Sequence, residues 1–247
     1  MDRKALLNYL DDYLKVSSFK DYAPNGLQVE GAEDIRKIVT GVTASQALID
    51  KTIELGADTL LVHHGYFWKN EIPTITGMKK KRIESLLSHN INLIGYHLPL
   101  DAHPVLGNNA QLATLWSIED ITPEPTSLVR LGVLSEPMAI EAFKGRVDES
   151  LKRESLHLPG GKSQVQKVAW CSGGAQNYIQ QAIDWDADVY ISGEVSEQTT
   201  HQALECGIHY LAAGHHATER LGVQMLGEHL KEHFALDVVF CDINNPV

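Results

Sequence analysis

Two short segments of the sequence, together with one aspartate, could bind metal ions. His63 and His64 are adjacent, and His215 precedes Glu219 by four residues. Both segments follow apolar runs that predict strands, and open α/β sheets place their sites at the carboxyl ends of strands. With Asp101 added, these imidazoles and carboxylates suit borderline divalent cations such as zinc, manganese, iron or nickel, and no thiolate is required.

The spacing within each segment has a geometric consequence. Side chains alternate faces along a strand, so His63 and His64 would diverge if the strand continued. Gly65 follows at once and can release the backbone, so that both rings turn toward one pocket. His215 and Glu219 share a face if a helix begins there. Such a ligand count is typical of two ions about 3.5–4 Å apart that share a carboxylate.

The alternative for any single histidine is an ordinary surface or core residue, and the chain has 12 histidines. His103 and His216 are interpreted as residues without a role in the site or as residues that orient a ligand. Six further histidines show no pattern and are interpreted as structural: His89, His157, His201, His209, His229 and His233.

An internal repeat supports the ligand set. Residues 37–64 align without a gap with residues 167–194, and the hydrophobic pattern of strand, helix and strand matches better than the residue types. After each copy the sequence shows a histidine followed four residues later by an acid, at 97–101 and 215–219. In this alignment Glu194 takes the place of His64, so we predict that Glu194 lies beside the site.

Strands alternating with helices predict an α/β fold with mixed sheets. The repeat predicts two related lobes from an internal duplication, residues 1–124 and 125–247 with a repeat core at 167–241, with the metal site in the cleft between them. Residues 122–125 contain two prolines and mark the predicted seam. Hydrophobic periodicity predicts helices at 4–15, 45–55, 79–89, 109–116 and 138–152, and strands at 39–42, 59–62, 92–96 and 238–241.

Composition limits the classes of function. A chain of 247 residues with a formal charge of −11 lacks the cationic balance of a general nucleic-acid-binding protein. Residues 79–82 form a local basic run, which we interpret as a solvated helix start; phosphate binding is the alternative. No apolar run reaches the length of a membrane span, and the N-terminus does not resemble a signal peptide. Three widely spaced cysteines predict a reduced, cytoplasmic setting.

Five motifs together resemble a known family. They are Asp21-Tyr22-Ala23-Pro24-Asn25-Gly26-Leu27-Gln28-Val29, Val62-His63-His64-Gly65, His97-Leu98-Pro99-Leu100-Asp101, Gly193-Glu194 and Gly214-His215-His216-Ala217-Thr218-Glu219. From about Tyr22 to the C-terminus the chain resembles the Nif-three-like family, whose members are often named GTP cyclohydrolase I type 2 homologues, and it is most similar to the short bacterial subfamily.

The resemblance implies a two-lobed α/β fold, two divalent metal ions per chain and a ring-shaped homohexamer. It maps the family's ligands onto His63, His64, Asp101, His215 and Glu219, with Glu219 bridging the metals. The implied activity is a metal-dependent hydrolase of the GTP cyclohydrolase type, acting on a nucleotide or another small molecule.

Within that activity, bound metals would activate a water molecule, with Glu194 as the general base or acid and His97 sharing that role or orienting a ligand. The reaction would open the purine ring at C8 and release formate. The sequence lacks a phosphate-binding P-loop, so a triphosphate would need other donors. Two alternatives stay open: a hydrolase of another phosphoester or amide, and a non-catalytic protein that stores, delivers or senses metal.

Overall fold

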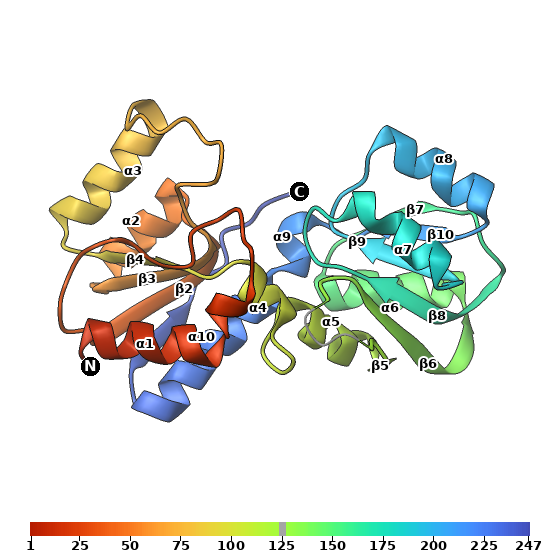
Figure 1. Ribbon diagram of the computed structural model, residues 1–247, viewed down its shortest axis with the longest axis horizontal. Coiled ribbons are helices and arrows are strands. Elements are labelled where there is room, and N and C mark those ends of the chain that lie inside the picture. The colour runs from red at the N-terminus through yellow and green to blue at the C-terminus, as the bar shows by residue number, and fades with distance from the viewer. Residues whose placement is uncertain (124–126) are drawn as a thin grey trace. The chain divides into compact units, whose positions relative to one another are not determined.

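The computed structural model describes residues 1–123 and 127–247. Its contacts divide the chain into two compact units, the first formed by Met1–Leu100 and Gly222–Asn244, the second by Asp101–Leu221 and Asn245–Val247. Each unit contains one mixed sheet with helices on both faces (Figure 1). The predicted α/β fold with mixed sheets is therefore confirmed.

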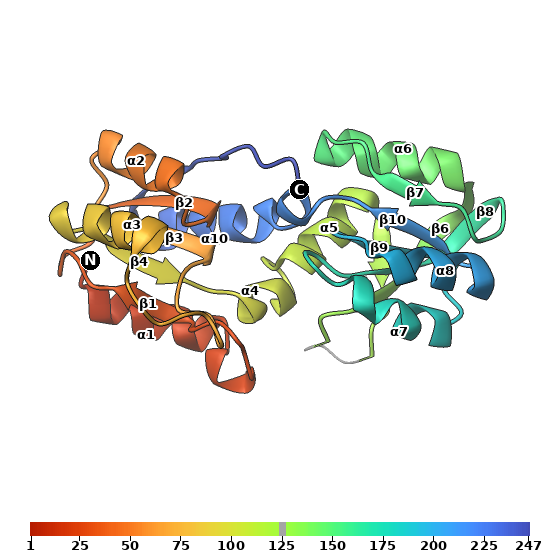
Figure 2. The ribbon, with the colours of Figure 1, turned by 90° about the horizontal axis from the view of Figure 1, so that it is seen from above.

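The sheet of the first unit has the strand order β1-β4-β3-β2-β11. Strand β1 is antiparallel to β4, and the other neighbouring pairs are parallel. Helices α2 and α3 cover one face of this sheet, and α1 and α10 cover the other (Figures 1 and 2). The element bounds are α1 Arg3–Tyr13, β1 Gly26–Val29, β2 Lys37–Thr43, α2 Gln46–Glu54, β3 Thr59–His64, α3 Gly77–Ser88, β4 Asn92–Gly95, α10 Arg220–Phe234 and β11 Asp237–Phe240.

The sheet of the second unit has the order β5-β6-β8-β9-β10-β7, in which β8, β9 and β10 run parallel. Its elements, with the short helix α4 before them, are α4 Leu98–Ala102, α5 Asn108–Trp116, β5 Ile118–Asp120, β6 Arg130–Ala139, α6 Ile140–Leu151, β7 Leu156–Leu158, β8 Gln164–Trp170, α7 Ile179–Asp184, β9 Val189–Ser192, α8 Glu197–Cys206, β10 His209–Ala212 and α9 His215–Thr218. Two single-turn 3-10 helices, Val16–Ser18 and Gln176–Tyr178, complete the described elements.

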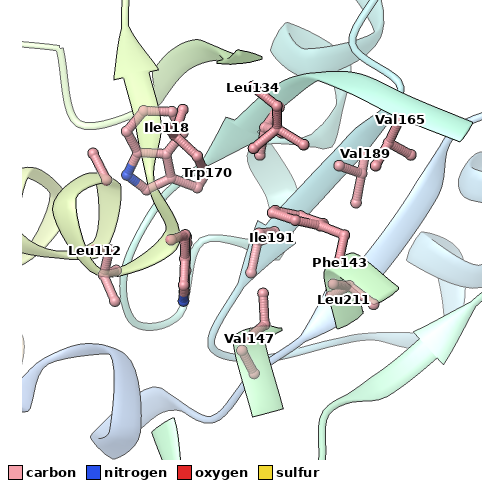
Figure 3. Close-up of a cluster of buried hydrophobic side chains, with 14 of the residues drawn as sticks. Leu112, Ile118, Leu134, Phe143, Val147, Val165, Trp170, Val189, Ile191 and Leu211 are labelled. Carbon is pink, nitrogen blue, oxygen red and sulfur yellow. The ribbon is translucent and has the colours of Figure 1, made fainter. Parts of the chain in front are cut away.

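The core of the second unit follows from strand alternation. Trp170, Val189 and Leu211 point from the sheet toward α5 and α6, where Phe143 fills the centre of the cluster (Figure 3). On the opposite face, a second buried cluster that includes Tyr190 packs against α7 and α8. Apolar burial on both faces is what parallel strands require, since helices cover both of their sides.

The aligned segments 37–64 and 167–194 share a local structure at Asp58 and Asp188. Asp58 accepts hydrogen bonds through Oδ2 from the backbone N–H groups of Arg36 (2.9 Å) and Lys37 (3.3 Å). Asp188 accepts the equivalent pair from Gln166 and Lys167, both at 2.9 Å. The order of strands and helices that follows is also shared. Duplication itself stays a prediction.

The C-terminal part of the chain differs from the sequence prediction. The predicted second lobe, 125–247, included a final strand at 238–241, whereas β11 pairs with β2 in the sheet of the first unit. Helix α10 joins it there, because Gly227 lets the helix approach Thr40 and Val238 closely. Periodicity shows that a strand exists but does not show which sheet receives it. Glu124 and Pro125 of the predicted seam lie outside the described residues.

Among the described residues, no helix combines the length and the apolar character that crossing a membrane requires.

Candidate metal centre

The end of β3 carries the two adjacent histidines. His63 is buried, and its Nδ1 lies 2.9 Å from the carbonyl oxygen of Tyr96. Because a carbonyl can only accept, Nδ1 carries the proton and Nε2 the lone pair, which is the form that binds metals. His64 is half-buried, and its Nδ1 lies 3.2 Å from the hydroxyl of Thr43.

His97, just beyond the end of β4, joins this pair. Its ring centroid lies 5.1 Å from that of His63 and 5.8 Å from that of His64. One ring nitrogen from each of the three histidines lies within 4.8 Å of the others, which is close enough for a shared ion. The structure therefore brings His97, predicted as a catalytic residue, together with two predicted ligands inside the first unit.

Asp21 fixes the ring of His97, and sequence reasoning gave it no role. Its Oδ1 lies 2.9 Å from His97 Nδ1, and it also accepts hydrogen bonds from the backbone of Ala23 and Leu98 and from the Asn25 amide. Burial alone would raise the pKa of Asp21, but the hydrogen bonds from His97, Ala23 and Asn25 outweigh it and hold that pKa well below its usual range. Asp21 belongs to the first family motif, and that resemblance was the only available signal.

Asp101 belongs to the second unit, where two donors orient it. The side chain is buried, and its Oδ1 accepts hydrogen bonds from Asn108 Nδ2 and Ser172 Oγ, both at 2.9 Å. Ser172 lies just after β8, so α5 and the sheet together set the direction of the carboxylate. A carboxylate held in this way is preorganised as a ligand.

His215 and Glu219 lie side by side, as their spacing predicted. His215 Nε2 is 3.1 Å from Glu219 Oε2, and Glu219 is buried. His215 Nδ1 lies 2.7 Å from Glu194 Oε1. Burial by itself would lower the pKa of His215, but the two carboxylates Glu219 and Glu194 outweigh it and raise this pKa to about 9. The imidazole is thus held between two carboxylates, one on each ring nitrogen.

A glycine makes room for the Glu219 carboxylate. Gly173 has a φ of +65°, in the left-handed region, and a Cβ built there would lie 2.1 Å from Glu219 Oε1. The backbone N–H of Gly173 donates to Thr218 Oγ1 at 3.0 Å. The carboxylate therefore occupies the space that a side chain would need at this position.

The nearby thiol is a poor ligand. Cys171 is buried, and burial first, then the charges of Asp101 and Glu219, raise its pKa well above the usual value. A thiol must lose its proton to bind a metal. The candidate donors of the second unit are therefore carboxylates and an imidazole.

The remaining polar candidates have local contacts. His103 Nδ1 accepts from the backbone N–H of Leu106 at 3.0 Å, which caps the turn after α4. Lys79 lies 3.2 Å from Glu71 and over the ring of Phe67, which supports the interpretation of 79–82 as a helix start. His216, whose side chain is buried, lies within α9 directly after His215.

Known proteins are similar to this chain, in sequence and in fold, along its whole length. A protein of Yersinia pestis named "GTP cyclohydrolase 1 type 2 homolog" is 54% identical over 238 residues, covering 96% of each chain. A solved structure described as protein ybgI, of unknown function, superposes with a TM-score of 0.97 at 52% identity and covers 100% of both chains. A crystal structure of the Thermus thermophilus protein TTHA1606 gives a TM-score of 0.92 at 36% identity with the same coverage. The family model of Duf34/NIF3 (NGG1p interacting factor 3) matches residues 1–246, and the chain belongs to that family.

Proposed function

We propose that this protein binds two divalent metal ions through His63, His64, Asp101, His215 and Glu219. We further propose that it uses them to hydrolyse a nucleotide or a related small molecule. The observation that carries the proposal is the orientation of the donors. In His63, the ring nitrogen opposite the candidate ligand atom is hydrogen-bonded to a carbonyl, and in His215 it is hydrogen-bonded to a carboxylate. Such outer partners fix the tautomer and direction of metal-binding imidazoles.

The donor types fit the ions. Imidazole and carboxylate suit zinc, iron, manganese or nickel, and the protonated Cys171 thiol adds no softer donor. When bound, two divalent ions lower the pKa of a water molecule and polarise the group that it attacks. Glu219, buried against His215, is the residue that we assign to bridging.

Proton transfer is assigned to His97. With Nδ1 held by Asp21 at 2.9 Å, its Nε2 is the nitrogen that exchanges a proton with water or substrate. Glu194 was predicted as the general base, and orienting a ligand was the alternative. Its 2.7 Å contact with His215 Nδ1 favours the orienting role.

The proposed substrate class is supported by the names of similar proteins, which are called homologues of a GTP cyclohydrolase. On this proposal, a first water adds at C8 of a purine nucleotide and the C8–N9 bond breaks, which leaves a formamide on N7. A second water then hydrolyses this formamide, so that formate leaves and an amine remains on the pyrimidine ring. A small-molecule substrate and a homohexameric ring complete the proposal.

Metal analysis of protein purified without chelator, followed by turnover assays with GTP and a panel of nucleotides, phosphoesters and amides, tests this function. We expect about two ions per chain and metal-dependent product. Less than one ion per chain after reconstitution contradicts the ligand set. Two ions without turnover on any substrate contradict the hydrolase and favour a metal-handling protein.

The Glu219→Ala variant tests the bridging role. It should lose most of its bound metal, whereas Glu197→Ala, which removes an exposed acid in the first turn of α8, should keep it. Full occupancy in the Glu219 variant would refute the bridging role.

A further inference from the structure

Two aromatic rings lie against the histidines of the first unit. The ring of Tyr22 meets that of His97 edge-on, with centroids 5.0 Å apart and planes at 75°. The ring of Trp68 meets His97 in the same way, at 5.0 Å and 78°, and lies 5.7 Å from His64. Tyr22 and Trp68 are themselves 5.7 Å apart, with their planes inclined by 36°. We call these two residues the aromatic pair.

Hydrogen bonds hold Trp68 in this position. Its indole N–H donates to the carbonyl of Gly65 at 3.1 Å, and its backbone N–H donates to Glu71 Oε2 at 3.1 Å. The next residue, Lys69, donates its backbone N–H to the carbonyl of Tyr22 at 2.7 Å. The segments that carry the two rings are therefore tied together, and the pair forms a preorganised surface.

The backbone before Trp68 is strained. Phe67 has a φ of +65°, a conformation that bulky side chains rarely adopt. Strain of this kind persists where the surroundings impose it, often at ligand sites. Here the strained residue immediately precedes the ring that contacts His64 and His97.

Exposure distinguishes Tyr22 from a tyrosine that serves only the core, while Trp68 is half-buried. Tyr22 is 53% exposed although it lies between buried Ala23 and the hydrogen-bonded Asp21. By contrast, Tyr66 is buried, and its hydroxyl donates to the carbonyl of Ala44 at 2.7 Å. A tyrosine that serves only the core resembles Tyr66 and not Tyr22.

The chemistry of the pair selects a flat ring. Tyrosine and tryptophan bind planar heteroaromatic groups by stacking. The two rings have centroids 5.7 Å apart and planes inclined by 36°, so a bicyclic group can stack on one ring while its edge contacts the other. The nearest carboxylate along the chain, Asp21, is occupied by its own donors. A neutral ring fits this surface better than a phosphate does.

We propose that Tyr22 and Trp68 bind a flat bicyclic heteroaromatic ring of the substrate and hold it against His64 and His97. This inference rests on the proposed function, since it places the ring beside the same metal-binding histidines. It names the pair as the determinant of substrate class.

Equilibrium binding to the metal-loaded protein tests the proposal, with guanosine and pterin as bicyclic probes and ribose 5-phosphate as a probe without an aromatic ring. Tyr22→Leu and Trp68→Leu remove the rings, while Tyr22→Phe and Trp68→Phe keep an aromatic ring. Tyr178→Leu removes a tyrosine of similar exposure, 42%, elsewhere on the chain. Metal content, measured for every variant, shows that the site is still folded.

We expect guanosine or pterin to bind, ribose 5-phosphate to bind far more weakly, and each leucine variant to lose about tenfold or more in affinity at unchanged metal content. The phenylalanine variants and Tyr178→Leu should stay within about threefold of the original chain. Failure of both bicyclic probes to bind, equal binding of ribose 5-phosphate, or leucine variants within twofold would each overturn the proposal.

Turnover assays on the same variants, compared with the binding measurements, separate this inference from the proposed hydrolysis. Ring binding that depends on the aromatic pair, without turnover of GTP or any other substrate, supports the inference and contradicts the hydrolase. Turnover of GTP that is unchanged in both leucine variants supports the hydrolase and contradicts the inference.

Discussion

Replacement of Glu194 should weaken metal binding without abolishing it. Glu194 touches His215 through one hydrogen bond of 2.7 Å, on the ring nitrogen opposite the one beside Glu219. Removing this acceptor leaves every proposed ligand in place but lets the imidazole rotate and makes it less basic. The amide in Glu194→Gln can still accept the bond, whereas Glu194→Ala cannot.

The expected loss of metal affinity follows from the geometry of this hydrogen bond. A hydrogen bond to a charged group contributes about 1.5–3 kcal/mol, and a neutral one about 0.5–1.5 kcal/mol. The Glu194 side chain is 36% exposed, which places the charged bond toward the lower end. Glu194→Gln should therefore cost about 1 kcal/mol, or roughly fivefold in metal affinity. Glu194→Ala should cost about 1.5–2.5 kcal/mol, or roughly 10- to 70-fold, within the range known for partners of metal ligands.

Competition with a chromophoric chelator measures both affinities, and Glu197→Gln is the control because Glu197 is exposed. A Glu194→Ala affinity within twofold of the original chain would refute the orienting role. Loss of metal as complete as in Glu219→Ala would make Glu194 a ligand. Retained affinity with abolished turnover would restore Glu194 as the general base.

Three further predictions concern residues around the site and in the second unit. Gly173→Ala should displace the Glu219 carboxylate and lower metal occupancy. Gly174→Ala is the control, because its Cβ would lie 3.5 Å from the nearest atom and should leave the occupancy unchanged. Equal metal occupancy in both variants would contradict the steric argument. Phe143→Ala should lower the free energy of unfolding in urea by about 3–5 kcal/mol, because the ring is fully buried, and a loss below about 1 kcal/mol would be inconsistent with that packing. Asp148 accepts hydrogen bonds from Ser155 and Lys144 that outweigh burial and lower its pKa, so Asp148→Asn should cost about 1 kcal/mol near pH 7. The difference in the free energy of unfolding between the original chain and Asp148→Asn should shrink as the pH falls below about 5, because Asp148 then becomes protonated in the folded state as well. A difference that is independent of pH would argue against a charge effect.

Local pattern predicted much of the fold. The helix predicted at 4–15 is α1, Arg3–Tyr13, and the strand predicted at 59–62 is β3, Thr59–His64. The helix predicted at 138–152 is α6, Ile140–Leu151. These elements have strong periodicity, which needs no tertiary information.

The sheet register agrees with the alignment of residues 37–64 with 167–194, because Ile38 pairs with Thr59 as Val168 pairs with Val189, but the two copies differ beyond these segments. Val62 pairs with Gly95, two residues before His97, while Ser192 pairs with Ala212, three residues before His215. The second copy thus has one additional residue, and Gly214, with a φ of +98°, lies directly before the histidine. This additional residue lies outside the segments that align without a gap, and the shared spacing of 97–101 and 215–219 does not reveal it.

The hydrogen-bond partners of His97 and Asp101 could not be predicted from the sequence, for a different reason. Asp21 and His97 are 76 positions apart in the sequence, and Ser172 and Asp101 are 71 apart. Neither spacing carries a periodic signal, because these contacts arise from how the strands are ordered in the sheet. The candidate ligands and Glu194 could be named from the sequence, whereas Asp21 and Ser172, which contact His97 and Asp101, required the fold.

The return of β11 to the first sheet has a consequence for synthesis. Strand β2 receives its neighbour from residues 237–240, after the ribosome has added nearly all of the second unit. Until then the nascent chain exposes the N–H and C=O groups of β2 as an open edge, which invites pairing with other chains. Residues 101–221, which form the second unit apart from Asn245–Val247, are therefore translated before the first unit receives its last helix and strand. The first unit begins first, but its strand β2 obtains this neighbour only near the end of synthesis.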